Sequence, residues 1–439
     1  MALAVDPILA PLADVAGLMY PTLFAPDVGV GAMSLRNPAA AQAAFRVGRG
    51  PEARAVLRAM RAEPTFAQLL NGPTSASPTT SEEWTFAEMV RENTGHGRRL
   101  WDFELPLAII EAAARNVLAS RESTPTLQQV QDELPRILKD VRALIGGQPV
   151  SAYVVSACAG LRLAEGVRLA TAWGSLRSAT EPERSHRPGL SPEPLTILET
   201  EFPLSWQLGE GQAEYSELFR DASSQAYRLP LAAALALGVD SVPTVTWQAI
   251  RAPLRHWGPS SWRPRPIWVD SLTDDVGPLS DTQQADLIEW IDLVAHHYEP
   301  SIEIAERRLI AAIADNPHDH QDGLIDAVIA WENLFGDGIS AEMTYRITTA
   351  LALLLEGNPV ERPGLAKELR KLYGDRSKVA HGGAIRGDVA AKRRRATEVA
   401  LAALRIMFQD RPALLGRDDR GMRLLLGIPD TFVQPEEVG

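Results

Sequence analysis

Apolar residues recur every three to four positions along the last third of the chain, which predicts a series of amphipathic helices. The predicted helices cover residues 282–314, 322–336, 340–356, 363–380 and 388–409. Short connections favour antiparallel neighbours packed as a bundle. The expected N-caps are Asp281 or Thr282, Asp322, Ser340 and Asp388, with Pro363 in a first turn and Gly382 and Gly383 at a helix end.

The pattern is different upstream of this bundle. Helical spacing recurs within residues 1–150, at Leu105–Leu118 and Leu127–Leu144, where Pro135 is expected to break the second helix. Short segments rich in β-branched and aromatic residues then predict an antiparallel sheet. These segments are Ser151–Cys158, Thr196–Gln207 and Thr244–Leu254.

The predicted fold class is therefore α+β and multidomain, with an all-α helical bundle at the C-terminal end. The expected units are a helical region (1–150), a β-rich domain (151–280), the bundle (281–410) and a partly ordered tail (411–439). The β-rich domain would end in an ordered linker rich in proline, in which Trp257, Trp262 and Trp268 dock onto a domain or stack on bases.

The net charge and its distribution along the chain limit the kinds of partner that the protein can bind. The chain has 439 residues and a net charge of −12, and such a field repels polyanions in general. Residues 371–395, however, carry eight Lys or Arg and two Asp, so this basic island has a net charge of +6 and the remainder is near −18. A local basic island can bind phosphate without coating nucleic acid.

Compartment and membrane contact follow from composition. No apolar run reaches the ~18 residues of a membrane helix, and we expect no secretory leader. The single cysteine, Cys158, excludes an intrachain disulfide and a cysteine zinc site, so a cytoplasmic location without membrane contact is expected.

Charged residues continue two apolar stripes in the bundle. Leu365, Leu369 and Leu372 form a core-facing stripe, and its next member is Arg376. Ile325 and Ile329 lead in the same way to Glu332, and Arg346 lies beside the apolar face of a third helix. Since a buried arginine requires a partner, the pattern predicts an ion pair between Glu332 and an arginine.

His381 follows Arg376 by five residues, which places the two about 140° apart on an ideal helix. The glycines after His381 indicate that the helix ends there, where the last carbonyls favour a protonated imidazole. Arginine can hold phosphate oxygens, and histidine can transfer a proton near neutral pH. With Ser377 beside Arg376, these residues form a candidate phosphodiester site.

The tracts DGLIDAVIAWENLFGDG (322–338), YRITTALALLL (345–355) and ELRKLYGDRSKVAHGG (368–383) resemble the Apea-like branch of the HEPN superfamily. The resemblance covers residues 281–410 and includes an R-x4-H motif, Arg376 to His381. It implies a bundle that forms a homodimer, with the motifs of both chains in one cleft. It also implies an endoribonuclease that needs no metal or other cofactor, often a toxin or antiphage-defence effector.

By this resemblance, the ribose 2′-hydroxyl attacks the adjacent phosphate of RNA. His381 would act as general acid and base, Arg376 would neutralise the phosphate, Ser377 would assist, and Glu332 would position Arg376 with Arg346 in support. The expected contacts of single-stranded RNA are the cations of the basic island. These are Lys371, Lys378, Lys392, Arg393, Arg394 and Arg395. The region before residue 281 would sense a phage or nucleotide trigger.

Less specific interpretations stay open. The motif residues could be structural, and the bundle could be a non-catalytic module for dimerisation or for binding RNA or nucleotides. Residues 392–395 could be a solvated helix start. His318 and His320 lack a third metal ligand at suitable spacing, and the loop Gly95–Arg99 and the pair His296 and His297 are more typical of surface structure.

Overall fold

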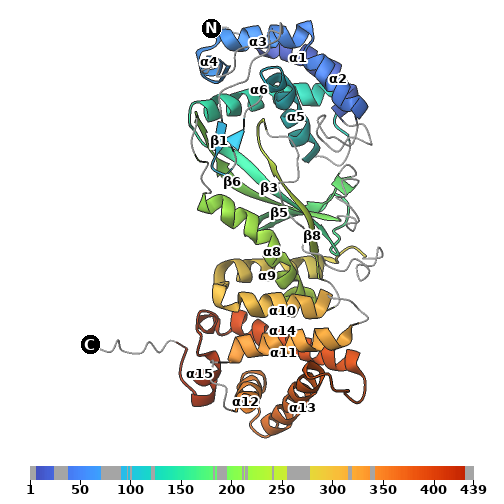
Figure 1. Cartoon of the computed structure of the whole chain (residues 1–439), viewed down its shortest axis with the longest axis vertical. Coiled ribbons are helices and arrows are strands. Elements are labelled where there is room, and N and C mark those ends of the chain that lie inside the picture. Colours follow the sequence, from blue (N-terminus) through green and yellow to red (C-terminus); the bar gives the residue numbers. More distant parts are fainter. Residues whose placement is uncertain are drawn as a thin grey trace, which may run out of the picture.

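The computed structural model describes most of the chain. The described residues are 6–23, 38–70, 90–95, 97–98, 101–119, 124–180, 183–184, 195–209, 212, 216–239, 242–254, 277–314, 319–336 and 342–430. Three layers follow one another along the molecule, namely N-terminal helices, a central sheet and C-terminal helices (Figure 1). The predicted combination of helices and an antiparallel sheet is confirmed as a mixed α/β fold.

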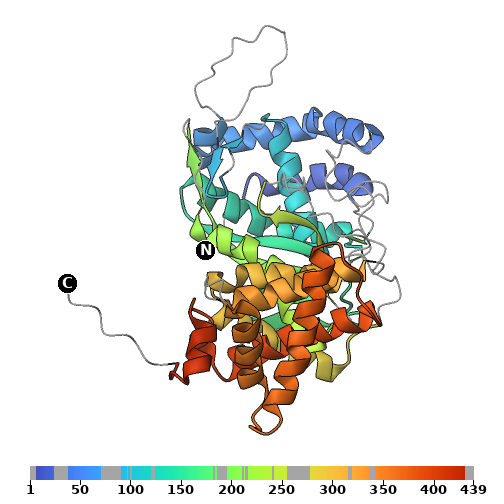
Figure 2. The same cartoon turned by 60° about the horizontal axis from the view of Figure 1, so that its bottom comes forward.

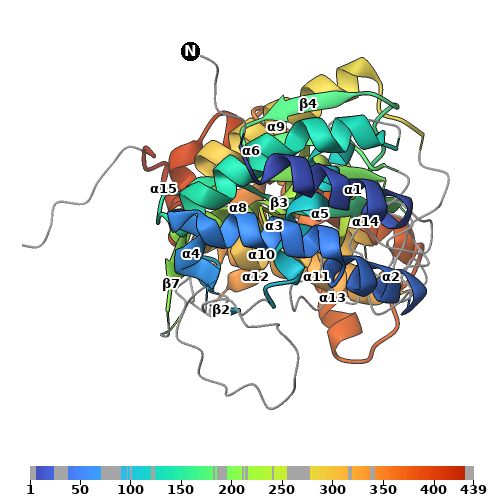
Figure 3. The same ribbon diagram turned by 90° about the horizontal axis from the view of Figure 1, so that it is seen from above.

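The N-terminal layer consists of α1 (Leu9–Leu23), α2 (Pro38–Gly48), α3 (Pro51–Ala62), α4 (Pro64–Leu70), α5 (Glu104–Ala119) and α6 (Leu127–Ile145). Viewed from above, α1, α3 and α6 lie over the sheet (Figure 3). The expected break at Pro135 is wrong, because α6 is continuous through it. Pro135 lies on the exposed side of α6, where water can satisfy the carbonyl that loses its backbone donor.

The central sheet has five antiparallel strands in the order β4-β5-β6-β3-β8. They are β3 (Val150–Ala159), β4 (Arg168–Thr171), β5 (Gly174–Ser178), β6 (Thr196–Leu204) and β8 (Thr244–Arg251). All three predicted segments thus contain strands, with Val155 opposite Glu199 and Ala249. A smaller sheet joins β1 (Val90–Glu92), β2 (Gly97–Arg98) and β7 (Trp206–Leu208).

The pattern did not predict β4, β5 or the long helix α8 (Glu217–Leu237), which packs against β6, β3 and β8. The predicted Trp-rich linker, including all three of its tryptophans, lies outside the described residues apart from 277–280.

The C-terminal layer contains α9 (Asp281–His297), α10 (Glu303–Ala314), α11 (His320–Phe335), α12 (Met343–Leu355), α13 (Arg362–Ala380), α14 (Val389–Gln409) and α15 (Arg420–Leu426). Figure 2 brings this layer to the front. The predicted helix 282–314 is wrong as one element, because the short 3₁₀ turn Pro300–Ile302 separates α9 from α10. The other four predicted helices are confirmed within a few residues.

Helix ends confirm some of the expected caps. Asp388 accepts a hydrogen bond from the Ala391 amide (3.1 Å), and Pro363 lies in the first turn of α13. Gly382 has a φ of +74°, the left-handed conformation that favours glycine after a helix. Ser280 and Asp319 cap α9 and α11 in place of the expected residues. No described side chain caps α12, and the expected cap Ser340 lies outside the described residues.

The hydrophobic core is continuous across residue 280, the expected domain boundary. Buried residues of α8, such as Leu231 and Leu235, share one core with Leu287 and Ile291 of α9 and with the rest of the bundle. Residues 411–430 also pack on this core, through α15 and α12. The bundle is therefore closed by α8 on one side and by α15 on the other.

Candidate functional site

The ion pair expected of Glu332 is present. Glu332 on α11 accepts a hydrogen bond from Arg376 on α13, with 3.0 Å between Nη2 and Oε2. Both side chains are partly buried, with exposures of 22% and 21%. Among the described residues Arg376 makes no other hydrogen bond through its side chain, so its guanidinium keeps donors for an anion.

Tyr373 is a member of this site that the sequence pattern did not single out. Its hydroxyl donates to Glu332 Oε1 at 2.5 Å. Burial, together with the Glu332 carboxylate, raises the pKa of Tyr373 to about 12. A tyrosine three residues before Arg376, next to a leucine stripe, is the sequence feature that could have indicated this role.

His381 lies at the C-cap of α13, and its side chain is exposed. Its backbone amide donates to the Ser377 and Lys378 carbonyls at 3.2 Å, while its imidazole has no hydrogen-bond or ion-pair partner among the described residues. The helix continues to Ala380. Arg376 and His381 are thus separated by about 140° around α13 of a single chain.

A second carboxylate lies next to the motif arginine. Asp375 is 5% exposed, and it faces Lys392 of α14 (2.7 Å from Nζ to Oδ2) and Lys378 (3.4 Å). Burial acts to raise the pKa of Asp375, but the two lysines outweigh it and lower the pKa below its usual value. Asp375 was also not predicted as a site residue.

Arg393 is not part of an RNA-facing surface. The side chain is buried, and it donates from Nε to the Ala312 carbonyl (2.6 Å) and from Nη2 to the Ile313 carbonyl (3.0 Å). These carbonyls end α10, so Arg393 caps the C-terminus of that helix. The prediction that it contacts RNA is corrected for this physical reason.

The remaining predicted cations are distributed around α13 and α14. Lys371 and Lys378 are exposed on α13, Arg394 pairs with Glu398 (3.4 Å), and Arg395 pairs with Glu368 (2.7 Å). Two further predicted residues are partly buried, Ser377 beside Arg376 and Arg346 in the first turn of α12.

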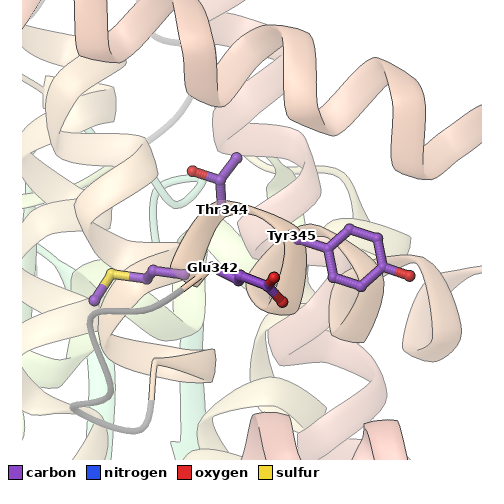
Figure 4. A pocket seen from close by; sticks show the side chains of 4 residues that line it. Glu342, Thr344 and Tyr345 are labelled. Atoms are coloured by element: carbon purple, nitrogen blue, oxygen red, sulfur yellow. The ribbon is translucent and has the colours of Figure 1, made fainter.

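A pocket of about 570 Å³ opens beside this site, at the start of α12 (Figure 4). Glu342, Met343, Thr344 and Tyr345 line it. Tyr345 is 54% exposed, and Glu342 has a φ of +57°, which is uncommon outside glycine. Helix α12 packs against α11 and α13, so the pocket lies on a helix next to those that carry Glu332 and Arg376.

No cluster of three or more metal-binding side chains occurs among the residues that the structure describes. His320 Nδ1 is 3.5 Å from Arg393 Nη1, and Asp319 caps the start of α11, whereas His318 lies outside the described part, as do His96 and Arg99. Within the described ranges, no helix has the length and apolar character needed to cross a membrane.

Comparison with known proteins gives no relative: no family model, no curated protein and no solved structure matches the chain. The chemistry of the site therefore has to be judged from its own residues. A partly buried arginine held by a carboxylate, an exposed histidine five residues later and neighbouring lysines can bind a phosphodiester and transfer a proton.

Proposed function

We propose that the chain is a metal-independent endoribonuclease of the HEPN type that acts as a homodimer in the cytoplasm. The observation that carries the proposal is the pair of Glu332 with Arg376, which occurs where the R-x4-H resemblance requires an oriented arginine. The exposed imidazole of His381 at the end of the same helix is consistent with this function.

In the proposed reaction, His381 removes the proton of a ribose 2′-hydroxyl, and the 2′-oxygen attacks the adjacent phosphorus. The bond to the 5′-oxygen breaks, this oxygen takes up a proton, and a 2′,3′-cyclic phosphate remains. Arg376 neutralises the phosphate oxygens, Glu332 keeps the guanidinium in position, and Ser377 assists. Acid–base catalysis by such a histidine contributes ~10²–10⁴ in rate.

A second copy of the chain would complete the site. Because Arg376 and His381 lie about 140° apart around one helix, a single copy does not bring both side chains to one phosphate through helix geometry alone. A two-fold axis next to α13 would bring the His381 of each copy toward the Arg376 of the other.

The pocket beside α12 offers a place for a base next to the cleaved bond. Tyr345 could stack on a base, as exposed aromatic residues do in proteins that bind single strands. In this proposal the chain is a toxin or antiphage-defence effector, and the helices and sheet before α9 sense a phage or nucleotide trigger.

The test is cleavage of single-stranded RNA by the full chain in the presence of EDTA. We expect Arg376→Ala and His381→Ala each to abolish cleavage while light scattering still reports a dimer. The cyclic phosphate end should be detectable by mass spectrometry of the products. Equal RNA decay with wild type and both variants, under every activating condition tried, would refute the proposal.

The second candidate is a non-catalytic module for dimerisation or for binding RNA or nucleotides, with an N-terminal sensing region. It is favoured by the bonds of Glu332 to both Arg376 and Tyr373, since such a network can also serve only to hold helices together. In that case His381→Ala should keep the biological activity, whereas substitutions in the apolar contacts of the bundle should abolish it.

A further inference from the structure

We propose that Lys392 and Asp375 are a positioning pair that fixes the His381 loop (residues 381–388). This proposal rests on the proposed ribonuclease function and gives Lys392 a role other than contacting RNA. Lys392 lies in the first turns of α14, and Asp375 directly precedes Arg376 on α13. The pair therefore joins the two helices at the ends that the loop connects.

The ammonium group of Lys392 holds two separate parts of the site. Nζ is 2.7 Å from Asp375 Oδ2, and it also donates to the Arg386 carbonyl at 2.5 Å. The first contact attaches α14 to the helix that carries Arg376, and the second attaches the loop that begins with His381. One cation thus fixes the loop relative to the motif arginine.

The loop requires such an attachment because its own backbone is permissive. It contains Gly382, Gly383 and Gly387, of which the first and last have φ values of +74° and +84°. Glycine has more conformational freedom than other residues. Apart from the Lys392 contact, the loop is held at its start by the His381, Gly382 and Gly383 amides, at its end by the Asp388 cap of α14, and between them by the partly buried Ile385.

Burial makes this pair different from an ordinary surface salt bridge. The side chains of Lys392 and Asp375 are 16% and 7% exposed, so water and salt screen their attraction only weakly. A lysine in this position also has less of its charge available to a phosphate. The exposed Lys371 and Lys378 on α13 are better placed for that role.

The chain offers a matched control. Arg395 and Glu368 form another ion pair between α14 and α13, also at 2.7 Å, but their exposures are 44% and 45%. Within the described part of the chain, neither side chain of this pair forms a hydrogen bond or ion pair with the His381 loop. It tests whether any cross-link between the two helices has the same effect.

The experiment compares Lys392→Met, Asp375→Asn and Glu368→Gln in the full chain, with Lys392→Arg as the conservative variant; Glu368→Gln breaks the control pair and leaves the Arg395 cation in place. Steady-state cleavage of a fluorescent single-stranded RNA gives kcat and KM, and hydrogen exchange gives the protection of the loop amides. We expect Lys392→Met and Asp375→Asn to lower kcat by roughly 10–100-fold at unchanged KM, since small displacements of a catalytic group have effects of this size. Loop exchange should accelerate in both, Glu368→Gln should match wild type in kcat and in loop exchange, and Lys392→Arg should restore most of kcat.

Three results would overturn the proposal. One is a raised KM with a smaller salt dependence and unchanged kcat in Lys392→Met, which would mean that Lys392 contacts RNA. Another is an equal loss of kcat in Glu368→Gln, and the third is unaltered loop exchange in Lys392→Met and Asp375→Asn. If wild type and Arg376→Ala prove equally inactive on RNA, the ribonuclease proposal fails, but loop exchange still decides the positioning pair. If Lys392→Met does not fold, Asp375→Asn serves as the test.

Discussion

Replacing Gly323 by alanine should destabilise the protein, although alanine is the better helix former. A β-carbon at this position of α11 would lie 2.5 Å from Nε and 2.6 Å from Cδ of Arg393. These distances are too short for non-bonded atoms, so Arg393 would have to move. Its guanidinium cannot move freely, because it is buried and holds the last carbonyls of α10.

The size of the expected loss of stability follows from the hydrogen bonds that Arg393 would lose. A hydrogen bond to a charged group contributes about 1.5–3 kcal/mol. If the new methyl group breaks one of the two bonds from Arg393 to Ala312 and Ile313, the loss exceeds the gain in helix propensity, which is about 1 kcal/mol. We therefore expect Gly323→Ala to lower the free energy of unfolding by about 0.5–2 kcal/mol.

The assay is urea denaturation followed by circular dichroism, in wild-type and Arg393→Met backgrounds. In the Arg393→Met background, which lacks the guanidinium, Gly323→Ala should raise the free energy of unfolding by up to about 1 kcal/mol instead of lowering it. Gly374→Ala on α13 is the control, because nothing lies within 4 Å of its β-carbon, and it should stabilise in both backgrounds. Equal destabilisation by Gly323→Ala in both backgrounds would refute the cap.

Three further outcomes are expected. Burial alone would raise the pKa of Glu199, but Arg251 and Arg177 lower it to about 2. The ionised Glu199 carboxylate therefore stabilises the fold above its unfolded pKa near 4.5, and this stabilisation is lost as the pH falls from 4.5 toward 2. Acid unfolding of Glu199→Gln should show a weaker pH dependence in that window, and an identical profile would contradict this. Tyr345→Ala should raise KM for RNA by roughly 5–150-fold, equivalent to ~1–3 kcal/mol of base stacking, while Tyr345→Phe and the exposed control Val360→Ala should not. Equal KM values would remove the pocket from the site. A fragment starting at residue 281 should bind the dye ANS and aggregate, because it exposes the face of α9 that α8 covers, whereas the full chain should not. A monodisperse short fragment would disprove the shared core.

The helices of the last third could be predicted because their apolar positions follow a helical period. The division between α9 and α10 was the exception, and Pro300 was its visible cause. The missed helix α8 is instructive: it contains Pro230 and a run of alanines, so its periodicity is weak, and the sheet and α9 together cover much of its surface. Strands β4 and β5 are too short for their pattern to differ from that of a loop.

At the candidate site, the sequence predicted the contact between Glu332 and Arg376 because each continues an apolar stripe. It could not predict which cations turn inward. Lys392 and Arg393 are neighbours in the sequence with similar charge, yet the first pairs with Asp375 and the second caps α10. That outcome depends on where the ends of other helices lie in space, which local sequence does not encode.

Helix α14 contacts both α8, which packs against the central sheet, and the His381 loop. Near its far end, Arg405 donates to the Leu235 carbonyl of α8 (2.8 Å), and 13 residues earlier Lys392 holds the His381 loop. At 1.5 Å per residue these two attachments are about 20 Å apart on one rigid rod. If a ligand that binds to the sheet shifts α8, then either the hydrogen bond from Arg405 to α8 breaks or α14 moves together with α8. A conformational change in the N-terminal part of the chain would then displace the His381 loop directly, because the rigid helix α14 connects the two.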